Sequence, residues 1–237
     1  MRRARVGALL VLVAVAVALF LGLHRPDQKL PSRSDPPPLM LLTSLPLVFG
    51  EDFSLKGGGS PALRALETRY RIVPISVADP AELGKGRLLL MAHAQAQTPE
   101  NLVVLDEWVR GGGKMLLLAD PVLEWPSDRP LGDPLRPSPM FPDTGLLQHW
   151  GLRLDAPDQR GLQVRKVDGV EIATDSPGTL VGKCKIDSDR LIADCAIGKG
   201  RAIVIADADF LDVDRLGQPA RHNLDVLLKE LAKLEVG

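Results

Sequence analysis

The sequence has little of several features on which specialised proteins depend. Its 237 residues include 2 cysteines, too few for a disulfide-rich scaffold or a four-thiolate zinc site. Aromatic residues make up 4%, which is thin for the stacking platforms that bind single-stranded nucleic acid. An excess of one charge is also lacking, because 29 Lys and Arg against 30 Asp and Glu leave a formal net charge of -1. Without an overall basic field to attract a polyanion, we expect no nucleic-acid partner.

The short motifs of common catalytic and cofactor sites are missing as well. There is no Gly-Lys-Ser/Thr of a P-loop, no G-x-G-x-x-G fingerprint and no G-x-S-x-G elbow. His93 has no second histidine at ligand spacing, so we expect no zinc site. Neither cysteine lies at a strand-to-helix elbow, where a nucleophile would be expected. The sequence therefore predicts a protein without catalytic activity, metal or cofactor.

What the sequence does contain begins with residues 6–23, an unbroken apolar run, VGALLVLVAVAVALFLGL, that follows Arg2, Arg3 and Arg5. As a helix this run would be about 27 Å long, close to the roughly 30 Å hydrocarbon core of a bilayer. Its basic flank favours a cytoplasmic N-terminus. A cleaved signal peptide is the alternative, but no small-x-small cleavage pattern follows the run. We expect residues 1–23 to be an uncleaved, single-pass anchor in a bacterial inner membrane, with the rest of the chain in the periplasm.

A proline-rich segment separates the apolar run from the body of the chain. Residues 24–38, HRPDQKLPSRSDPPP, hold five prolines and can bury little apolar surface, which is typical of an extended linker. Residues 39–237 remain to form a folded domain, a length that suffices for one hydrophobic core.

The body alternates short apolar runs with helix starts. Runs typical of buried strands lie at residues 39–44, 71–77, 87–93, 114–119 and 201–206. Ser60-Pro61 and Thr98-Pro99 each place a capping residue before a proline, which predicts that helices begin there. Leucines at helical spacing predict a last helix over residues 219–236. This order predicts an α/β layered sheet with largely parallel strands.

Two loops could each bind a ligand or serve only as a structural connection. Residues 121–142 hold seven prolines in a segment longer than compact domains usually contain, and either a binding lid or a covering flap accounts for it. The glycine run 57–59 precedes a helix start, where backbone N–H groups can hold an anion. A flexible turn is the simpler interpretation of that run.

The two cysteines fall in a predicted hairpin. If the segments 180–186 and 191–197 pair so that Cys184 faces Cys195, then Lys185 faces Asp194 and the apolar residues share one face. Directly opposed residues can approach to bridging distance, and an oxidising compartment preserves the bond. Two buried free thiols are the alternative to this structural disulfide. A second hairpin is indicated by Asp168-Gly169.

Polar residues cluster after the predicted strands. In an open α/β sheet ligands bind beyond the carboxyl ends of the strands, where this sequence places His93, Asp120, Asp207 and Asp209. These four residues are candidate ligand-binding residues. Asp-Pro after a strand is also an ordinary turn, and Asp207 can cap the following segment, so a structural role is the alternative.

Three segments resemble the auxiliary component of gliding-motility-type ABC transport systems. They are residues 98–121, TPENLVVLDEWVRGGGKMLLLADP; residues 145–152, GLLQHWGL; and residues 198–211, GKGRAIVIADADFL, followed by Arg221-His222-Asn223. The resemblance implies a flavodoxin-like or class I glutamine amidotransferase-like domain, a three-layer α/β sandwich, without the amidotransferase nucleophile. We expect this sandwich to carry a C-terminal β-hairpin region and to follow one N-terminal transmembrane helix.

The same resemblance implies a function. It suggests a non-catalytic, membrane-anchored periplasmic binding or scaffold domain, accessory to an ABC-type transport system, with inner-membrane transport components as partners. A small-ligand or glycan-binding domain that uses the strand-end residues is one alternative. A hydrolase that uses Asp207, Asp209 and His93 is the other.

Overall fold

The computed structural model describes residues 35–49 and 59–236. The predicted anchor, residues 1–23, and residues 24–34 of the predicted linker lie outside these ranges. Among the helices of the described residues, none has the length and apolar character needed to cross a membrane.

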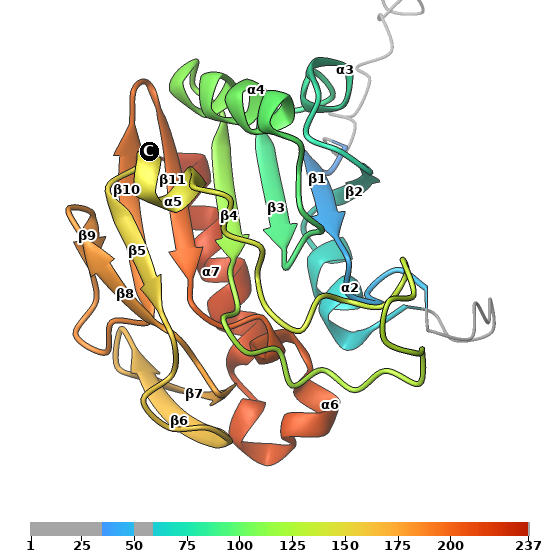
Figure 1. Cartoon of the computed structure of the whole chain (residues 1–237), viewed down its shortest axis with the longest axis vertical. Coiled ribbons are helices and arrows are strands. Elements are labelled where there is room, and N and C mark those ends of the chain that lie inside the picture. The colour runs from blue at the N-terminus through green and yellow to red at the C-terminus, as the bar shows by residue number, and fades with distance from the viewer. Residues whose placement is uncertain (1–34, 50–58, 237) are drawn as a thin grey trace, which may run out of the picture. The chain divides into compact units, whose positions relative to one another are not determined.

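Strands and helices alternate through the first half of the described chain (Figure 1). The elements in order are β1 (Pro38–Thr43), α2 (Pro61–Glu67), β2 (Arg71–Pro74), α3 (Pro80–Leu83), β3 (Leu88–Ala92), α4 (Pro99–Arg110) and β4 (Lys114–Leu118). Ser60 and Thr98 cap α2 and α4 as predicted, each accepting a hydrogen bond from the backbone N–H three residues later.

Strands dominate the second half. The elements are α5 (Leu146–His149), β5 (Leu152–Asp155), β6 (Leu162–Val167), β7 (Val170–Asp175), β8 (Thr179–Gly182), β9 (Lys185–Ile186), β10 (Ile192–Ile197), β11 (Gly200–Ile205), α6 (Val213–Leu216) and α7 (Asn223–Val236). Short 3-10 turns at Asp209–Leu211 and Gln218–Ala220 flank α6.

Within the described residues one seven-stranded sheet organises the fold, in the order β2-β1-β3-β4-β11-β10-β9. Neighbours from β2 to β11 run parallel, and β10 and β9 continue the sheet antiparallel. The central strands are buried along almost their whole length, which is why their sequences are continuous apolar runs.

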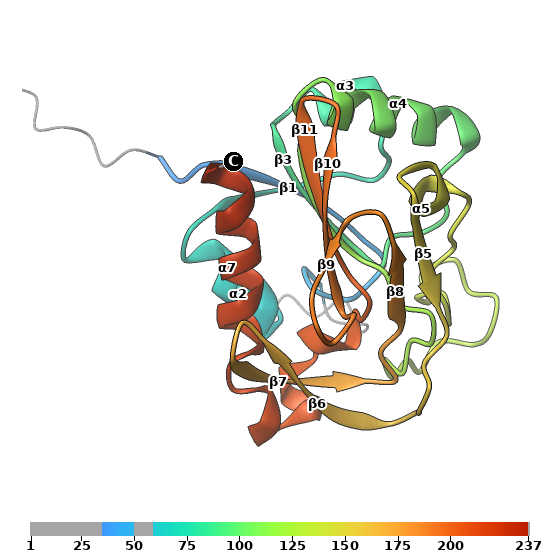
Figure 2. The ribbon, with the colours of Figure 1, turned by 90° about the vertical axis from the view of Figure 1, so that its left-hand side faces the viewer.

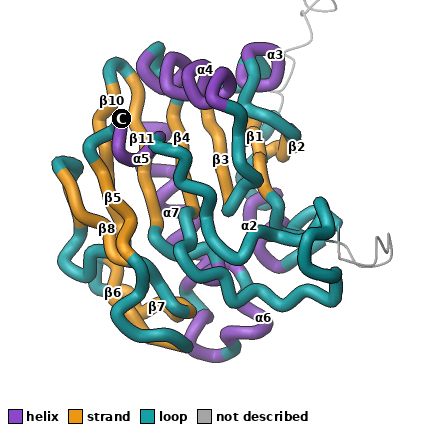
Figure 3. Tube along the Cα trace, in the orientation of Figure 1, coloured by secondary structure: helices purple, strands orange, loops and turns teal. Residues whose placement is uncertain are grey.

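The two faces of this sheet are covered differently (Figure 2). On one face lie α2 and α7, and α7 turns its buried leucines, among them Leu227, Leu231 and Leu234, toward the sheet. Helices α4 and α5 lie on the opposite face beside a separate two-stranded sheet of β5 and β8. A long loop, residues 119–145, completes this second face at the carboxyl ends of the strands (Figure 3).

This arrangement corrects the expected fold class. We expected a flavodoxin-like or amidotransferase-like three-layer sandwich with a C-terminal hairpin region. Instead, β10 and β9 belong to the main sheet, and one face is covered by helices, a two-stranded sheet and a loop together. The fold is a mixed α/β structure around a seven-stranded sheet. The expectation failed because it rested on a resemblance of three short segments, which does not determine which strands join the main sheet or what covers each face.

The predicted register of the cysteine hairpin is confirmed. Asp194 pairs with Lys185 and Ala193 with Ile186, and Cys184 forms a disulfide with Cys195. The outer half of the predicted hairpin departs from the prediction, because β8 turns away and pairs with β5. The bond therefore fastens the two-residue edge strand β9 to β10.

The second predicted hairpin is also confirmed. Strands β6 and β7 pair on either side of Asp168 and Gly169, which both adopt positive φ angles, 48° and 82°. Two consecutive positive φ angles are the mark of the tight two-residue turn that Asp-Gly favours.

Gly200, the first residue of β11, permits a close approach of two backbones. A Cβ atom at this position would lie 2.0 Å from the carbonyl oxygen of Val109 and 2.3 Å from that of Gly113. Because both obstacles are backbone atoms, they cannot rotate away. We expect Gly200→Ala to lower the free energy of unfolding by about 1–3 kcal/mol, as overpacking does. Urea unfolding measures the loss, and Gly86→Ala, whose Cβ would meet only the flexible side chain of Met40 at 3.5–3.7 Å, controls for general effects of the added methyl group. Equal stability of the two variants would contradict this prediction.

Candidate functional site

The sheet order brings the predicted strand-end residues to one edge. His93 follows β3, Asp120 follows β4, and Asp207 and Asp209 follow β11. Since these three strands are neighbours in the sheet, their carboxyl ends meet beneath the loop of residues 119–145. All four side chains are fully buried.

Asp120 joins the ends of β4 and β11. Its Oδ2 accepts hydrogen bonds from the backbone N–H groups of Ala208, at 2.8 Å, and Asp209, at 3.3 Å. Its Oδ1 accepts another from the N–H of Val122 at 2.9 Å, which turns the chain into the proline-rich loop. Both carboxylate oxygens are therefore engaged by the protein's own backbone.

Asp207 plays the same part between β11 and β7. Its Oδ1 accepts from the N–H of Phe210 at 2.6 Å, and its Oδ2 accepts from the N–H of Asp175 at 2.8 Å. One bond closes the turn after β11 and the other holds the end of β7 beside it.

Asp209 connects the cluster to a cation. Its Oδ2 accepts from the N–H of Glu124 at 2.7 Å, and its Oδ1 lies 2.9 Å from Nη2 of Arg215. Arg215 also contacts Asp175 at 2.5 Å and Asp212 at 3.1 Å. Sequence reasoning missed Arg215 and Asp175. The only local signal for Arg215 was its spacing of three residues from Asp212.

Crowding and burial change the acidity of these groups. Burial raises the pKa of Asp120 to about 6. Burial, reinforced by the charge of Asp120, raises the pKa of Asp209 to about 7. Burial and the charges of Asp120 and Asp209 raise the pKa of Asp207 well above its usual range.

His93 stands apart from the acidic residues and holds the loop instead. Its Nε2–H donates to the carbonyl oxygen of Ser138 at 2.9 Å, and its ring meets Phe141 edge-on at 6.4 Å between centroids. Its Nδ1 is buried and has no hydrogen-bond partner among the described residues. Burial lowers the pKa of the ring to about 4, so the side chain is neutral at physiological pH. The backbone φ of 44° is a left-handed conformation that a bulky residue rarely adopts.

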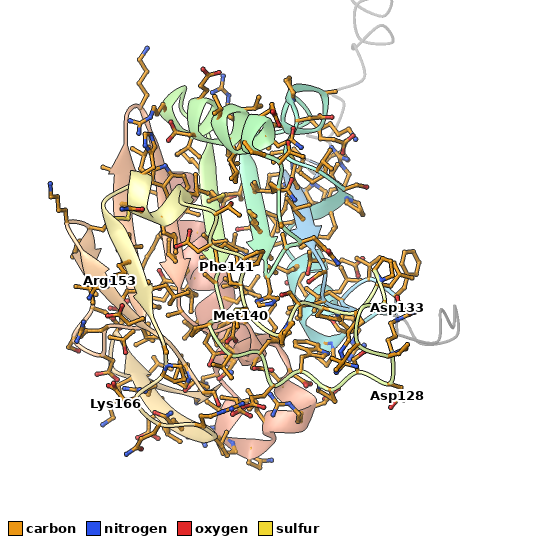
Figure 4. The ribbon with its side chains drawn as sticks, viewed as in Figure 1. Asp128, Asp133, Met140, Phe141, Arg153 and Lys166 are labelled. Carbon is orange, nitrogen blue, oxygen red and sulfur yellow. A yellow bond between two sulfur atoms is a disulfide. The ribbon has the colours of Figure 1, made fainter. Side chains whose placement is uncertain are left out.

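The loop itself covers the strand ends. Phe141 donates its backbone N–H to the carbonyl oxygen of Asp120 at 2.6 Å, so the loop is tied to both β3 and β4. Figure 4 shows Phe141 over the middle of the sheet and Asp128 and Asp133 on the outer part of the loop. The proline-rich loop, for which the sequence left both a binding lid and a covering flap open, is therefore hydrogen-bonded to the ends of β3 and β4 along its inner side.

A pocket opens where this loop passes the ends of β1 and β2. Its volume is about 240 Å³, and its lining is mostly apolar, including Leu41, Leu45, Val48, Phe49, Ile75 and Leu135. Its strand residues come from β1 and β2, so it lies one strand away from the junction of β1 and β3, at which the strand order reverses. None of the four predicted residues lines it.

The arrangement offers little for catalysis or metal binding. Each of the three buried aspartates uses both of its oxygens on backbone N–H groups or on Arg215. Within residues 35–49 and 59–236, no group of three or more His, Cys, Asp or Glu side chains is placed to hold a metal ion. In this structure these carboxylates accept hydrogen bonds that stabilise the turns after β4 and β11.

The raised and lowered pKa values predict how stability depends on pH. A carboxyl whose pKa is higher in the folded chain stabilises less as pH rises, and for Asp209 this window runs from about 4 to about 7. For Asp207 it extends further upward. His93 acts in the opposite sense, because its stabilisation is lost as pH falls from 6.5 toward 4. Because three carboxyls outweigh one imidazole, we expect these groups together to make stability fall as pH rises from about 4, and by about 1–2 kcal/mol between pH 6.5 and pH 8.

Urea unfolding at a series of pH values measures this profile. The variant His93→Gln should keep the fall between pH 6.5 and pH 8 and should show a steeper fall between pH 4 and pH 6.5, because His93 opposes the carboxyls only in that lower range. A wild-type profile that is flat or rises between pH 6.5 and pH 8 would contradict this prediction, because it would mean that the buried carboxyls have the same pKa in the folded protein as in the unfolded chain.

Comparisons with known proteins show the fold and little more. No family model matches the chain, and no curated protein matches it. Among solved structures, the exo-beta-1,4-mannosidase Op5Man5 from Opitutaceae bacterium strain TAV5 is similar with a TM-score of 0.52 and 10% identity, over 81% of this chain and 35% of that chain. The mmIFT52 N-terminal domain is similar with a TM-score of 0.52 and 14% identity, over 81% of this chain and 96% of that chain. A catalytic mutant of Gan42B, a GH42 beta-galactosidase from G. stearothermophilus, reaches 0.50 with 15% identity, over 84% of this chain and 30% of that chain.

These likenesses bear on the fold class. The chain spans about a third of the length of the two glycosidases and nearly all of the mmIFT52 domain. None of the three is an amidotransferase, which agrees with the correction made above. At 10% to 15% identity the likeness concerns the fold alone.

Proposed function

We propose that this chain is a non-catalytic, membrane-anchored binding or scaffold domain that serves an ABC-type transport system. The observation that carries the non-catalytic part is the engagement of Asp120, Asp207 and Asp209 by the backbone. Carboxylates that are fully buried and already accept hydrogen bonds from the backbone are poorly placed to activate water or to bind a substrate. The same contacts count against the glycan-binding and hydrolase alternatives, which both rest on these residues.

The binding part of the proposal rests on the apolar pocket beside β1. Leu135, on the proline-rich loop, is 56% exposed at its edge, and Phe49 is 53% exposed on the other side. Exposed apolar side chains around a concave surface are typical of a protein-protein contact. The pocket therefore suits an apolar side chain of a partner protein. The transport system as partner comes from the resemblance of residues 98–121, 145–152 and 198–211.

Affinity purification of the tagged full-length protein from its own membranes, in mild detergent, tests this proposal. We expect an ABC permease or ATPase to co-elute in stoichiometric amount. The variant Leu135→Asp should lose the partner, whereas Leu162→Asp should retain it, because Leu162 is equally exposed, at 55%, but lies on β6. A protein that elutes alone would refute the transport role. Equal retention by both variants would refute the pocket as the contact.

A further inference from the structure

A second concave surface lies between α4 and the segment that contains α5. Its volume is about 430 Å³, in the range of ligand-binding clefts. One wall is formed by the α4 side chains Leu102, Val103, Asp106 and Glu107, and the other by residues 144–149. The two walls are joined at one end, where Trp150 donates its Nε1–H to Asp106 at 2.8 Å. The ribbon views show α4 and α5 on the same face of the sheet (Figures 1 and 2).

The groove is apolar at its centre. Val103 is 58% exposed and faces solvent beside Leu102, across from Leu146. The exposed line of α4 consists of Glu100, Val103, Glu107 and Arg110, at spacings of three and four residues. An isolated exposed valine would be ordinary, but here it forms part of a concave surface between two helical segments. Grooves of this kind accept the apolar face of a helix.

The charge around the groove is unevenly distributed. At one end Asp106 is neutralised by Arg110, at 2.7 Å, and His149 lies 3.4 Å from it. The carboxylates of Glu100, in the first turn of α4, and of Glu107, which follows Asp106, are both exposed, and no ion pair with either is found among the described residues. The groove therefore combines an apolar floor with an unneutralised acidic rim, and its complement is an apolar side chain flanked by cations.

From this complementarity we propose that the groove is a docking site for a basic amphipathic helix of a partner protein. An apolar residue of that helix inserts between Val103 and Leu146, and its Lys or Arg residues face Glu100 and Glu107. This site is separate from the pocket beside β1 and does not depend on the transport role.

A pair of fluorescent helical peptides tests the proposal. Both carry leucines at i, i+3, i+4 and i+7, and one has lysine at the remaining positions where the other has glutamate. Binding is measured by anisotropy against the full-length protein in zwitterionic nanodiscs, with empty nanodiscs subtracted. We expect the basic peptide to bind at least about tenfold more tightly than the acidic one, with a difference that shrinks at high salt.

Two matched variants locate the binding. Val103→Glu should weaken the basic peptide by about tenfold, as loss of a central apolar anchor does. Val164→Glu, at an equally exposed valine on β6, should leave the affinity within about twofold of wild type. Glu107→Lys should weaken binding several-fold, and Glu67→Lys, on the exposed surface of α2, should not.

Each substituted residue is exposed, so the variants should fold, and circular dichroism confirms it. Equal binding of the two peptides would refute the charge complementarity. Loss of binding in neither Val103→Glu nor Glu107→Lys would place the contact elsewhere on the molecule and overturn the proposal.

Discussion

Asn223→Ala should lower the free energy of unfolding by about 3–5 kcal/mol, the largest effect we expect of a single substitution. Asn223, the first residue of α7, is fully buried and makes three hydrogen bonds. Its Nδ2 donates to the carbonyl oxygens of Ala173 and Phe210, each at 2.8 Å, and its Oδ1 accepts from the N–H of Ala173 at 3.0 Å. Removing the amide leaves three buried backbone groups unpaired, and each costs its desolvation free energy.

Urea unfolding of Asn223→Ala and of a control, Asn101→Ala, distinguishes the loss of these hydrogen bonds from the general effect of replacing asparagine by alanine in a helix. Asn101→Ala, inside α4, should change stability by no more than about 0.5 kcal/mol, because no hydrogen bond of its side chain is found among the described residues. A loss below about 1 kcal/mol for Asn223→Ala would mean that water or a backbone shift satisfies the freed groups.

Arg215→Met should lower the free energy of unfolding by about 2–4 kcal/mol at pH 8. The guanidinium is the cation to which Asp175, Asp209 and Asp212 are paired. Without it, the fully buried Asp209 would carry an unpaired charge. The loss should be smaller at pH 6, because Asp209, whose pKa is about 7, is then mostly protonated and neutral.

A second arginine provides the control. Arg153 forms a two-pronged pair with Asp155, but both side chains are exposed, and such pairs contribute less than about 1 kcal/mol. Arg153→Met should therefore unfold almost as the wild type does at both pH values. If Arg215→Met showed the same loss at pH 6 and pH 8, lost packing rather than charge would be responsible.

The sequence predicted those parts of the fold that local patterns determine. The alternation of apolar residues set the register of Cys184 and Cys195, and Asp168-Gly169 located a hairpin turn. The partner of β8 could not be found in this way, because alternation shows which residues share a face but not which strand lies alongside. Helix α3, four residues long, is too short to show a helical period.

The sequence predicted where the strand-end aspartates lie but not the contacts that they make. The rule that strand ends meet at one edge brought Asp120, Asp207 and Asp209 together correctly. What occupies their oxygens was beyond prediction, because Asp120 accepts from Ala208, 88 residues away in sequence. Arg215 escaped notice for the same reason, since two of its three partners come from other turns.

The two proposed binding surfaces lie at opposite ends of the main sheet. Helix α4 lies at the amino ends of β3 and β4, and the pocket lies at the carboxyl ends of β1 and β2 (Figure 1). A strand of six residues, such as β1, extends about 20 Å. Two partners can thus occupy the domain together without steric competition. A single assembly that presents both an apolar anchor and a basic helix would bind the second site at the high effective concentration set by the first, so that two weak contacts give tight bivalent attachment.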